Sequence, residues 1–253
     1  MIQLFNTIFY EPIFNTLVWL YNVVPGYDIG VAIIILTIIL KILLFPLNLQ
    51  SLRSQKAMQD IQPKINEIKK RLKDKKDEMS KAIMQLYRSE KVNPFSSCLP
   101  LLIQLPFLIA LYRVLLKALN SEGFEVLYPF IVNPGQINPI AFGFVNLAEP
   151  HNIPLALLAG VAQFFQGKMM ITSSPHKEAK KDPGSKDEAM LGSMNKQMLY
   201  FMPAITVFIG YSLPGGLILY WFVMNLLTIV QQWFFLKKKH NTNTTQINTN
   251  DTN

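Results

Sequence analysis

One lysine stands in the middle of an otherwise apolar run, IIILTIILKILLFPLNLQ, which covers residues 33–50. A charge at the centre of a membrane-spanning helix costs about 2.5–3.5 kcal/mol on insertion scales. An unpaired ammonium is also unfavourable in the core of a soluble protein. Thr37 and Asn48 fall on the same helical face as this lysine, Lys41. Lys41 is therefore the first candidate for a functional side chain.

Amide and hydroxyl side chains interrupt three further apolar runs: Gln104 in one, Gln163 and Gln166 in the next, and the stripe Asn225, Thr228 and Gln232 in the last. Such groups are costly against lipid, so we expect them to face one another or water. No Asp or Glu stands in the core of these runs to pair with Lys41. The pattern predicts a wet cavity around Lys41 that opens toward the cytoplasm. Two alternatives stay open, namely amides that only join helices and a lysine that snorkels to the inner surface.

The sequence contains no catalytic constellation. The patterns GxxxxGK[ST], HExxH and GxSxG are absent, and the three histidines lie far apart, at His151, His176 and His240. The methionines between Met169 and Met202 favour adaptable apolar packing over a metal site. We therefore predict no catalytic residue, no metal and no cofactor, and we do not expect an enzyme.

Long uncharged runs alternate with densely charged segments, and half of the residues are hydrophobic. About 20 apolar residues cross a bilayer core. The sequence predicts an all-α integral membrane protein whose core, residues 25–236, has five spans: 29–48, 95–116, 152–170, 197–212 and 214–236. The fourth span is short and Pro203 interrupts it, and only a tight turn separates it from the fifth.

Residues 1–24 form a sixth apolar stretch. One helical face carries the polar residues Gln3, Thr7, Glu11, Asn15 and Asn22, and the other carries Phe5, Phe9, Ile13, Leu17, Leu20 and Val24. This pattern predicts an amphipathic helix that lies in the outer membrane interface and breaks at Pro12. An additional span is the alternative.

Lysine and arginine residues set the predicted orientation. Residues 1–28 and 118–151 have none, whereas 49–92 have twelve, 168–196 have six and 237–239 have three. By the positive-inside rule the N-terminus lies outside and the C-terminus in the cytoplasm of a bacterial plasma (inner) membrane, with multiple spans. The net charge of +8 follows from these loops and does not indicate a specific nucleic-acid partner.

The cytoplasmic segment 50–91 has apolar residues at alternating spacings of three and four, beginning with Met58, Ile61 and Ile65 and resuming at Met79 after the charged sequence KDKKD. This spacing predicts an antiparallel helical hairpin; a solvated helical linker is the alternative. The outer loop 118–151 is rich in Pro, Gly and Asn, which favours irregular structure. The tail 237–253 is rich in Asn and Thr and is predicted to be disordered.

Several motifs resemble the YidC-type membrane protein insertases, a family with mitochondrial and chloroplast members, over residues 9–236. They are TIILKILLFPLNLQSLRSQKAM, IQPKI, LYRSEKVNPFSSCLPLLIQLPFLIALY, QMLYFMPAI and LPGGLILYWFVMNLLTIVQQW. The resemblance implies a five-span core with a hydrophilic groove that is open to the cytoplasm and the lipid. Lys41 stands where most bacterial relatives have arginine, so the charge is kept and the bidentate fork is lost.

The resemblance further implies that the chain inserts nascent membrane proteins into the lipid bilayer without nucleotide hydrolysis. A substrate segment would enter the groove formed by Lys41, Thr37, Gln104, Gln163, Gln166, Asn225, Thr228 and Gln232. It would then slide along spans two and four at Leu105, Pro106 and Pro203. Relatives that bind ribosomes strongly often have a long basic tail, whereas this tail has only Lys237–Lys239, so the sequence does not favour direct ribosome anchoring. Whether a Sec translocon takes part stays open. A small transporter or channel is the competing function, although the two halves of the chain show no inverted repeat.

Overall fold

The computed structural model describes residues 2–73, 75–93, 99–172 and 186–250. This part of the chain is mostly helical. Its elements, in chain order, are α1 (Ile2–Phe5), the π-helix η1 (Asn6–Tyr10), α2 (Glu11–Val23), the 3₁₀-helix η2 (Pro25–Tyr27), α3 (Ile29–Leu43), α4 (Phe45–Asp60), α5 (Gln62–Arg71), α6 (Lys76–Ser89), α7 (Leu99–Leu119), the 3₁₀-helix η4 (Phe124–Val126), the strands β1 (Ile140–Ala141) and β2 (Val145–Asn146), α8 (Ile153–Thr172), α9 (Lys186–Ser212) and α10 (Gly215–Asn250).

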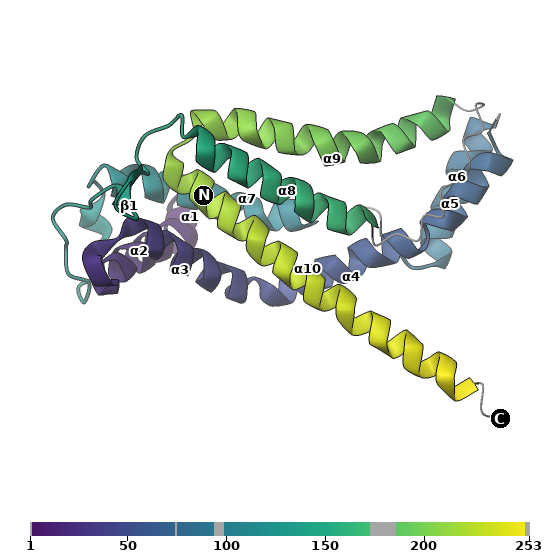
Figure 1. Cartoon of the computed structure of the whole chain (residues 1–253), viewed down its shortest axis with the longest axis horizontal. Helices are drawn as coiled ribbons and strands as arrows, with labels where there is room; N and C mark the ends of the chain where they lie inside the picture. The colour runs from purple at the N-terminus through teal and green to yellow at the C-terminus, as the bar shows by residue number, and fades with distance from the viewer. Residues whose placement is uncertain (1, 74, 94–98, 173–185, 251–253) are drawn as a thin grey trace.

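The helices are arranged along one long axis (Figure 1). α1, α2 and β1 gather at one end, and α5 and α6 lie at the opposite end. Between the two ends α10 packs on α8 and α3, α9 packs on α8, and α7 packs on η1, α2, α4 and α10. The elements that carry the polar residues of the apolar runs therefore share one bundle.

The largest apolar core lies at the end of the bundle that contains α2. Phe14, Leu17 and Val18 of α2 are fully buried there. They belong to one cluster with buried residues of the neighbouring elements, which include Ile29, Ile33, Leu111, Leu115, Ala141 and Leu147. Because these side chains come from α2, the outer loop, α3 and α7 and pack together, this cluster fixes α2 and the outer loop against the helices.

The N-terminal segment differs in detail from the predicted amphipathic helix. Helical geometry continues through Pro12, where we predicted a break, because the π-helix η1 runs directly into α2. Pro12 lies in the first turn of α2, where the hydrogen-bonding pattern changes from that of a π-helix to that of an α-helix. Asn15, which the sequence places on the polar face, is only 2% exposed. Its side chain is buried because it bonds to the outer loop, which helical periodicity does not reveal.

The first apolar run is bent and is not one straight helix. α3 ends at Leu43, and the following helix continues at 65° to it. Leu44 at the bend has φ −85° and ψ 0°, and Pro46 follows two residues later. Proline disfavours helical geometry in the residue before it and cannot donate a hydrogen bond to the preceding turn. The predicted span 29–48 therefore divides between α3 and the start of α4.

In the described part of the chain, fewer than five helices are long and apolar enough to be identified as membrane spans. One helix, Gly215–Phe234, is long and apolar enough to cross a membrane, and the bent pair that begins at Ile29 is a second candidate. Leu199–Ser212 is apolar but shorter. The number of spans thus stays a prediction.

Two helices continue where the sequence suggested interruptions. Pro203 lies inside α9, which begins at Lys186 and ends at Ser212 without a break. α10 extends to Asn250, through most of the segment 237–253 for which we predicted disorder. Helix propagation adds one hydrogen bond per residue to an existing helix, so weak helix formers can follow a strong one.

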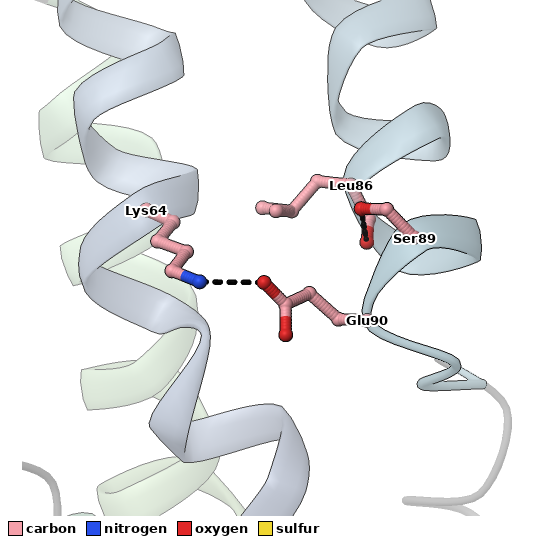
Figure 2. Close-up of polar contacts among 4 residues, drawn as sticks. All are labelled: Lys64, Leu86, Ser89 and Glu90. Carbon is pink, nitrogen blue, oxygen red and sulfur yellow. Dashed lines mark hydrogen bonds and ion pairs between the residues drawn. The ribbon is translucent and has the colours of Figure 1, made fainter.

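α5 and α6 lie side by side at the far end of the bundle. Lys64 of α5 forms an ion pair with Glu90, directly after α6, with 2.5 Å between Nζ and Oε1 (Figure 2). Ile61 and Ile65 are 5% and 2% exposed. The ion pair is largely exposed, so it contributes at most about 1 kcal/mol, and the apolar residues matter more for holding this end together.

Candidate functional site

Lys41 lies in the last turn of α3, directly before the bend. Its ammonium donates a hydrogen bond to the hydroxyl of Thr228 on α10, with 2.8 Å between Nζ and Oγ1. The C-terminal turn of a helix carries partial negative charge, which stabilises a cation by about 0.3–1 kcal/mol. The bend therefore places Lys41 closer to a helix end than a straight span would, and this partly explains how the charge is tolerated.

Thr228 is itself oriented by its own helix. Its hydroxyl donates to the carbonyl of Met224 at 2.7 Å, which leaves the oxygen lone pairs free to accept from Lys41. In the described part of the chain no carboxylate forms an ion pair with Lys41. A neutral hydroxyl does not cancel the charge of an ammonium. The positive charge at this position is therefore solvated by a dipole and remains available to an anionic group.

The other predicted groove residues form separate pairs between helices. Gln104 of α7 donates to the hydroxyl of Tyr220 on α10. Gln163 of α8 accepts from the hydroxyl of Thr206 on α9. Asn225 of α10 donates to the carbonyl of Ala159 on α8 at 3.4 Å. These bonds join α10 to α7 and α8, and α8 to α9, so the same amides also hold the bundle together.

Thr37 and Gln166 also belong to the predicted set. Thr37 is fully buried and donates to the carbonyl of Ile33, at 2.6 Å within its own helix. Gln166 is half-buried on α8, one turn after Gln163. Of the predicted set, Lys41 and Thr228 are thus the pair that the structure joins directly between α3 and α10.

Several buried amide atoms of α10 and α4 have no hydrogen-bond partner within the part of the chain that the structure describes. They are the side-chain oxygen of Gln232, both polar atoms of the neighbouring Gln231, and the oxygen of Gln55 on α4. An unsatisfied buried polar atom costs about 1–3 kcal/mol, so native proteins supply water or a partner for it. This end of α10 therefore has unfilled hydrogen-bonding capacity one turn beyond Thr228.

The three residues predicted for sliding lie on two helices, α7 and α9. Leu105 is 40% exposed on α7, and Pro106 follows it within the same helix. Pro203 is half-buried on α9, whose main packing partner is α8. Both helices present large exposed apolar side chains beside these positions, namely Ile109 and Tyr112 on α7 and Phe201, Met202 and Phe208 on α9.

Sequence reasoning missed four polar residues of this region: Tyr220, Thr206, Gln231 and Gln55. Tyr220 lies within an aromatic run, where its hydroxyl gives no periodic signal. Thr206 is a single hydroxyl three residues after Pro203, and Gln231 precedes the predicted Gln232. An explicit search for every hydrogen-bonding side chain in the apolar runs would have found all except Gln55, which lies outside them.

The basic residues of α5 and α6 are mostly solvated. Lys69 is the exception, because partial burial lowers the pKa of its ammonium. Burial likewise raises the pKa of the Tyr87 hydroxyl on α6. Both shifts are caused by desolvation of the charged form. Among the described residues, no group of three or more His, Cys, Asp or Glu side chains is arranged to hold a metal ion.

Comparison with protein families matches residues 19–243 to the family described as 60Kd inner membrane protein. A relative from Pelobacter propionicus, "Membrane protein insertase YidC", is 36% identical over 243 residues. A relative of the same name from Magnetococcus marinus is 36% identical over 228 residues. They align with 91% and 90% of this chain but with only 39% and 35% of their own length. The chain thus spans less than half of these relatives.

The fold is similar to that of a solved structure described as "Active YidC insertase crystal structure with the first transmembrane domain resolved". The TM-score is 0.58 and the sequence identity is 26%. The alignment covers 91% of this chain and 46% of the other. The arrangement of helices described above therefore recurs in an insertase of known structure.

Proposed function

We propose a function on the premise that this chain belongs to the 60Kd inner membrane protein family, the family of the YidC insertases, and is an inner membrane protein. The proposed function is insertion of nascent membrane proteins into the lipid bilayer. A substrate places a short polar or acidic segment beside Lys41, and its apolar segment passes into lipid along α7 and α9. The Lys41–Thr228 contact carries this proposal, because it holds an ammonium without a carboxylate partner among the described residues.

The energetics support transfer without a nucleotide. Each acidic residue faces a barrier of about 3 kcal/mol at the membrane centre, and a fixed positive charge offsets part of it. Twenty apolar residues release about 6–12 kcal/mol on insertion, at about 0.3–0.6 kcal/mol each. A membrane potential that is negative inside adds about 2.3 kcal/mol per exported negative charge per 100 mV. The chain then needs only to lower the free-energy barrier for moving the polar segment of the substrate across the membrane.

The unpartnered amides support a wet site. The buried polar atoms of Gln231 and Gln232 lie on α10 about one turn from Thr228. Water at these atoms, or the backbone of an entering segment, would satisfy them. We infer that a polar groove along α10 begins at these amides and continues past Lys41, with Gln104, Gln163, Gln166 and Asn225 on its walls.

The proposed topology assigns five spans to α3, α7, α8, α9 and α10, with α1 and α2 in the outer interface and the α5–α6 hairpin in the cytoplasm. α10 has 20 suitable residues, about 30 Å at 1.5 Å per residue, which matches a hydrocarbon core. α3 has only 15 residues, so its inner end lies within the membrane, and the basic hairpin would receive substrates beyond it.

The experiment measures insertion of a single-span protein with a short acidic outer tail into liposomes that contain only this chain, by protease protection. The variants are Lys41→Ala, Lys41→Arg and Thr228→Val. We expect Arg to insert as wild type does, Ala to lose insertion of the acidic substrate, and Val to reduce it mildly because the charge remains.

A matched substrate with a neutral tail is the control. Its insertion by Lys41→Ala and by wild type should differ far less than insertion of the acidic substrate does. Equal insertion of the acidic substrate by wild type and Lys41→Ala would contradict the role of the charge. Ion or solute leakage without insertion by any form would favour the transporter or channel function. Because no ribosome or Sec translocon is present, insertion by wild type would also show that neither is required.

A further inference from the structure

A short β-hairpin in the outer loop has aromatic residues at its tip. β1 and β2 pair in antiparallel fashion, with Ala141 opposite Val145. The residues between them, Phe142–Gly143–Phe144, are called the aromatic tip below. Phe142 and Gly143 have φ of +54° and +80°. Tight hairpin turns with two such residues strongly prefer Asn-Gly or Asp-Gly, and a bulky residue there is a steric outlier. The tip thus has a phenylalanine at a position whose positive φ is unfavourable for a bulky residue.

The aromatic tip is fixed to the start of α3 by one carboxylate. Asp28 accepts hydrogen bonds from the backbone N–H groups of Gly30 and Val31, at 2.8 and 3.1 Å, and so caps α3. Its second oxygen accepts from the N–H of Phe142 at 2.6 Å. Ala141 is fully buried against Gly30, where a Cβ on the glycine would lie 2.6 Å from that of Ala141. The tip therefore stays level with the first turn of α3.

Large apolar side chains are exposed at this level of the molecule. Phe144 is 82% exposed and Phe142 is 42% exposed. On α2 and η2, Trp19, Val23 and Tyr27 follow at spacings of four and are 47%, 61% and 60% exposed. Residues spaced four apart share a helix face, so Trp19 and Val23 form an apolar stripe at the end of α2. Tyr27 follows in η2, directly before Asp28.

We propose that the aromatic tip inserts into the interfacial region of the outer leaflet, beside the N-terminus of α3. This inference rests on the proposed placement of α3 as a span with Ile29 at its outer end. Aromatic side chains are enriched at membrane–water interfaces, where one end of the side chain is apolar and the other is wet. The tip continues an interfacial α2, and residues 118–151 contain no Lys or Arg that would favour an acidic protein partner.

The experiment uses the single cysteine of the chain. Cys98→Ser gives a cysteine-free background, into which Phe144→Cys is introduced and labelled with an environment-sensitive NBD fluorophore. The protein is reconstituted in phosphatidylcholine vesicles without any other protein. Gln136→Cys, an exposed position in the same loop, is the matched control for water, and Ile39→Cys on the exposed side of α3 is the control for lipid.

We expect the probe at Phe144 to be quenched by lipids with a nitroxide near the headgroup and to be protected from aqueous iodide, while the probe at Gln136 behaves in the opposite way. If the Phe144 probe matches the Gln136 probe while Ile39 reports lipid, the inference is overturned and the span remains. If Ile39 also reports water, both the inference and the placement of α3 are wrong. A tip that docks on another protein would give the first of these results, because no partner is present in the vesicles.

Discussion

Replacing Asn15 by leucine should loosen the outer loop from α2. The Asn15 amide donates to the carbonyl of Val126 at 3.0 Å and accepts from the N–H of Tyr128 at 2.6 Å. It also donates to the carbonyl of Glu11, within its own helix. Leucine has the same number and branching of side-chain heavy atoms but offers no hydrogen bond, so the Asn15→Leu variant removes the polar contacts while keeping the outline of the side chain.

The size of the effect follows from burial. Asn15 is 2% exposed, so the two backbone groups of the loop lose a partner in a site that water does not reach easily. Each of the two unsatisfied buried groups costs about 1–3 kcal/mol, which gives a loss of about 2–6 kcal/mol. For a chain of this size each kcal/mol lowers the melting midpoint by about 2–4 °C, so we expect a decrease of about 4–24 °C.

The assay is thermal denaturation of the purified protein in detergent, followed by intrinsic tryptophan fluorescence. Asn22→Leu is the matched control, because Asn22 also donates to the outer loop, to the carbonyl of Val132 at 2.7 Å, but in an exposed position. Water can replace that bond, so the control should change stability by no more than about 0.5 kcal/mol. Equal melting of the two variants, or no change in Asn15→Leu, would refute the reasoning.

Two further predictions concern packing and charge. Gly30→Ala would bring its Cβ to 2.6 Å from that of Ala141, so it should destabilise the protein by about 1–3 kcal/mol in the same melting assay. Gly210→Ala, whose Cβ would have its nearest contact at 3.4 Å, is the control and should be nearly neutral. Equal effects of the two substitutions would contradict the close approach of Gly30 and Ala141. Lys64→Glu should increase hydrogen exchange in α5 and α6 by an amount equivalent to about 1 kcal/mol or less. Adding Glu90→Lys should restore protection, because the reversed ion pair can form again. Unchanged exchange in Lys64→Glu would show that the ion pair contributes nothing.

The outcome at Lys41 shows how far sequence patterns can define a site. The stripe Asn225, Thr228 and Gln232 indicates a polar face on the last apolar run, and Lys41 indicates another on the first. Periodicity assigns a residue to a face of its own helix, but it does not say which helix lies opposite. That Lys41 meets Thr228, and that Gln104 meets Tyr220, follows from the packing of α10 against α3 and α7.

The buried position of Asn15 could not be predicted for a similar reason. Its hydrogen bonds go to backbone groups 111 and 113 residues away, and backbone groups have no signature in the sequence. The bend after α3 is different, because Pro46 was a local signal for it. We nevertheless predicted one continuous span, because the residues on both sides of the proline continue the hydrophobic run.

The sequence by itself determined the class of the protein: a mostly helical chain of the YidC insertase family, with one charge in an apolar run and basic residues confined to particular segments. These features depend on composition, local spacing and motifs. Only the tertiary structure decided that α3 ends two residues after Lys41, that a threonine accepts from it, and that Asp28 joins α3 to the aromatic tip. Such contacts join residues up to 187 positions apart, and their geometry is set when the helices pack together.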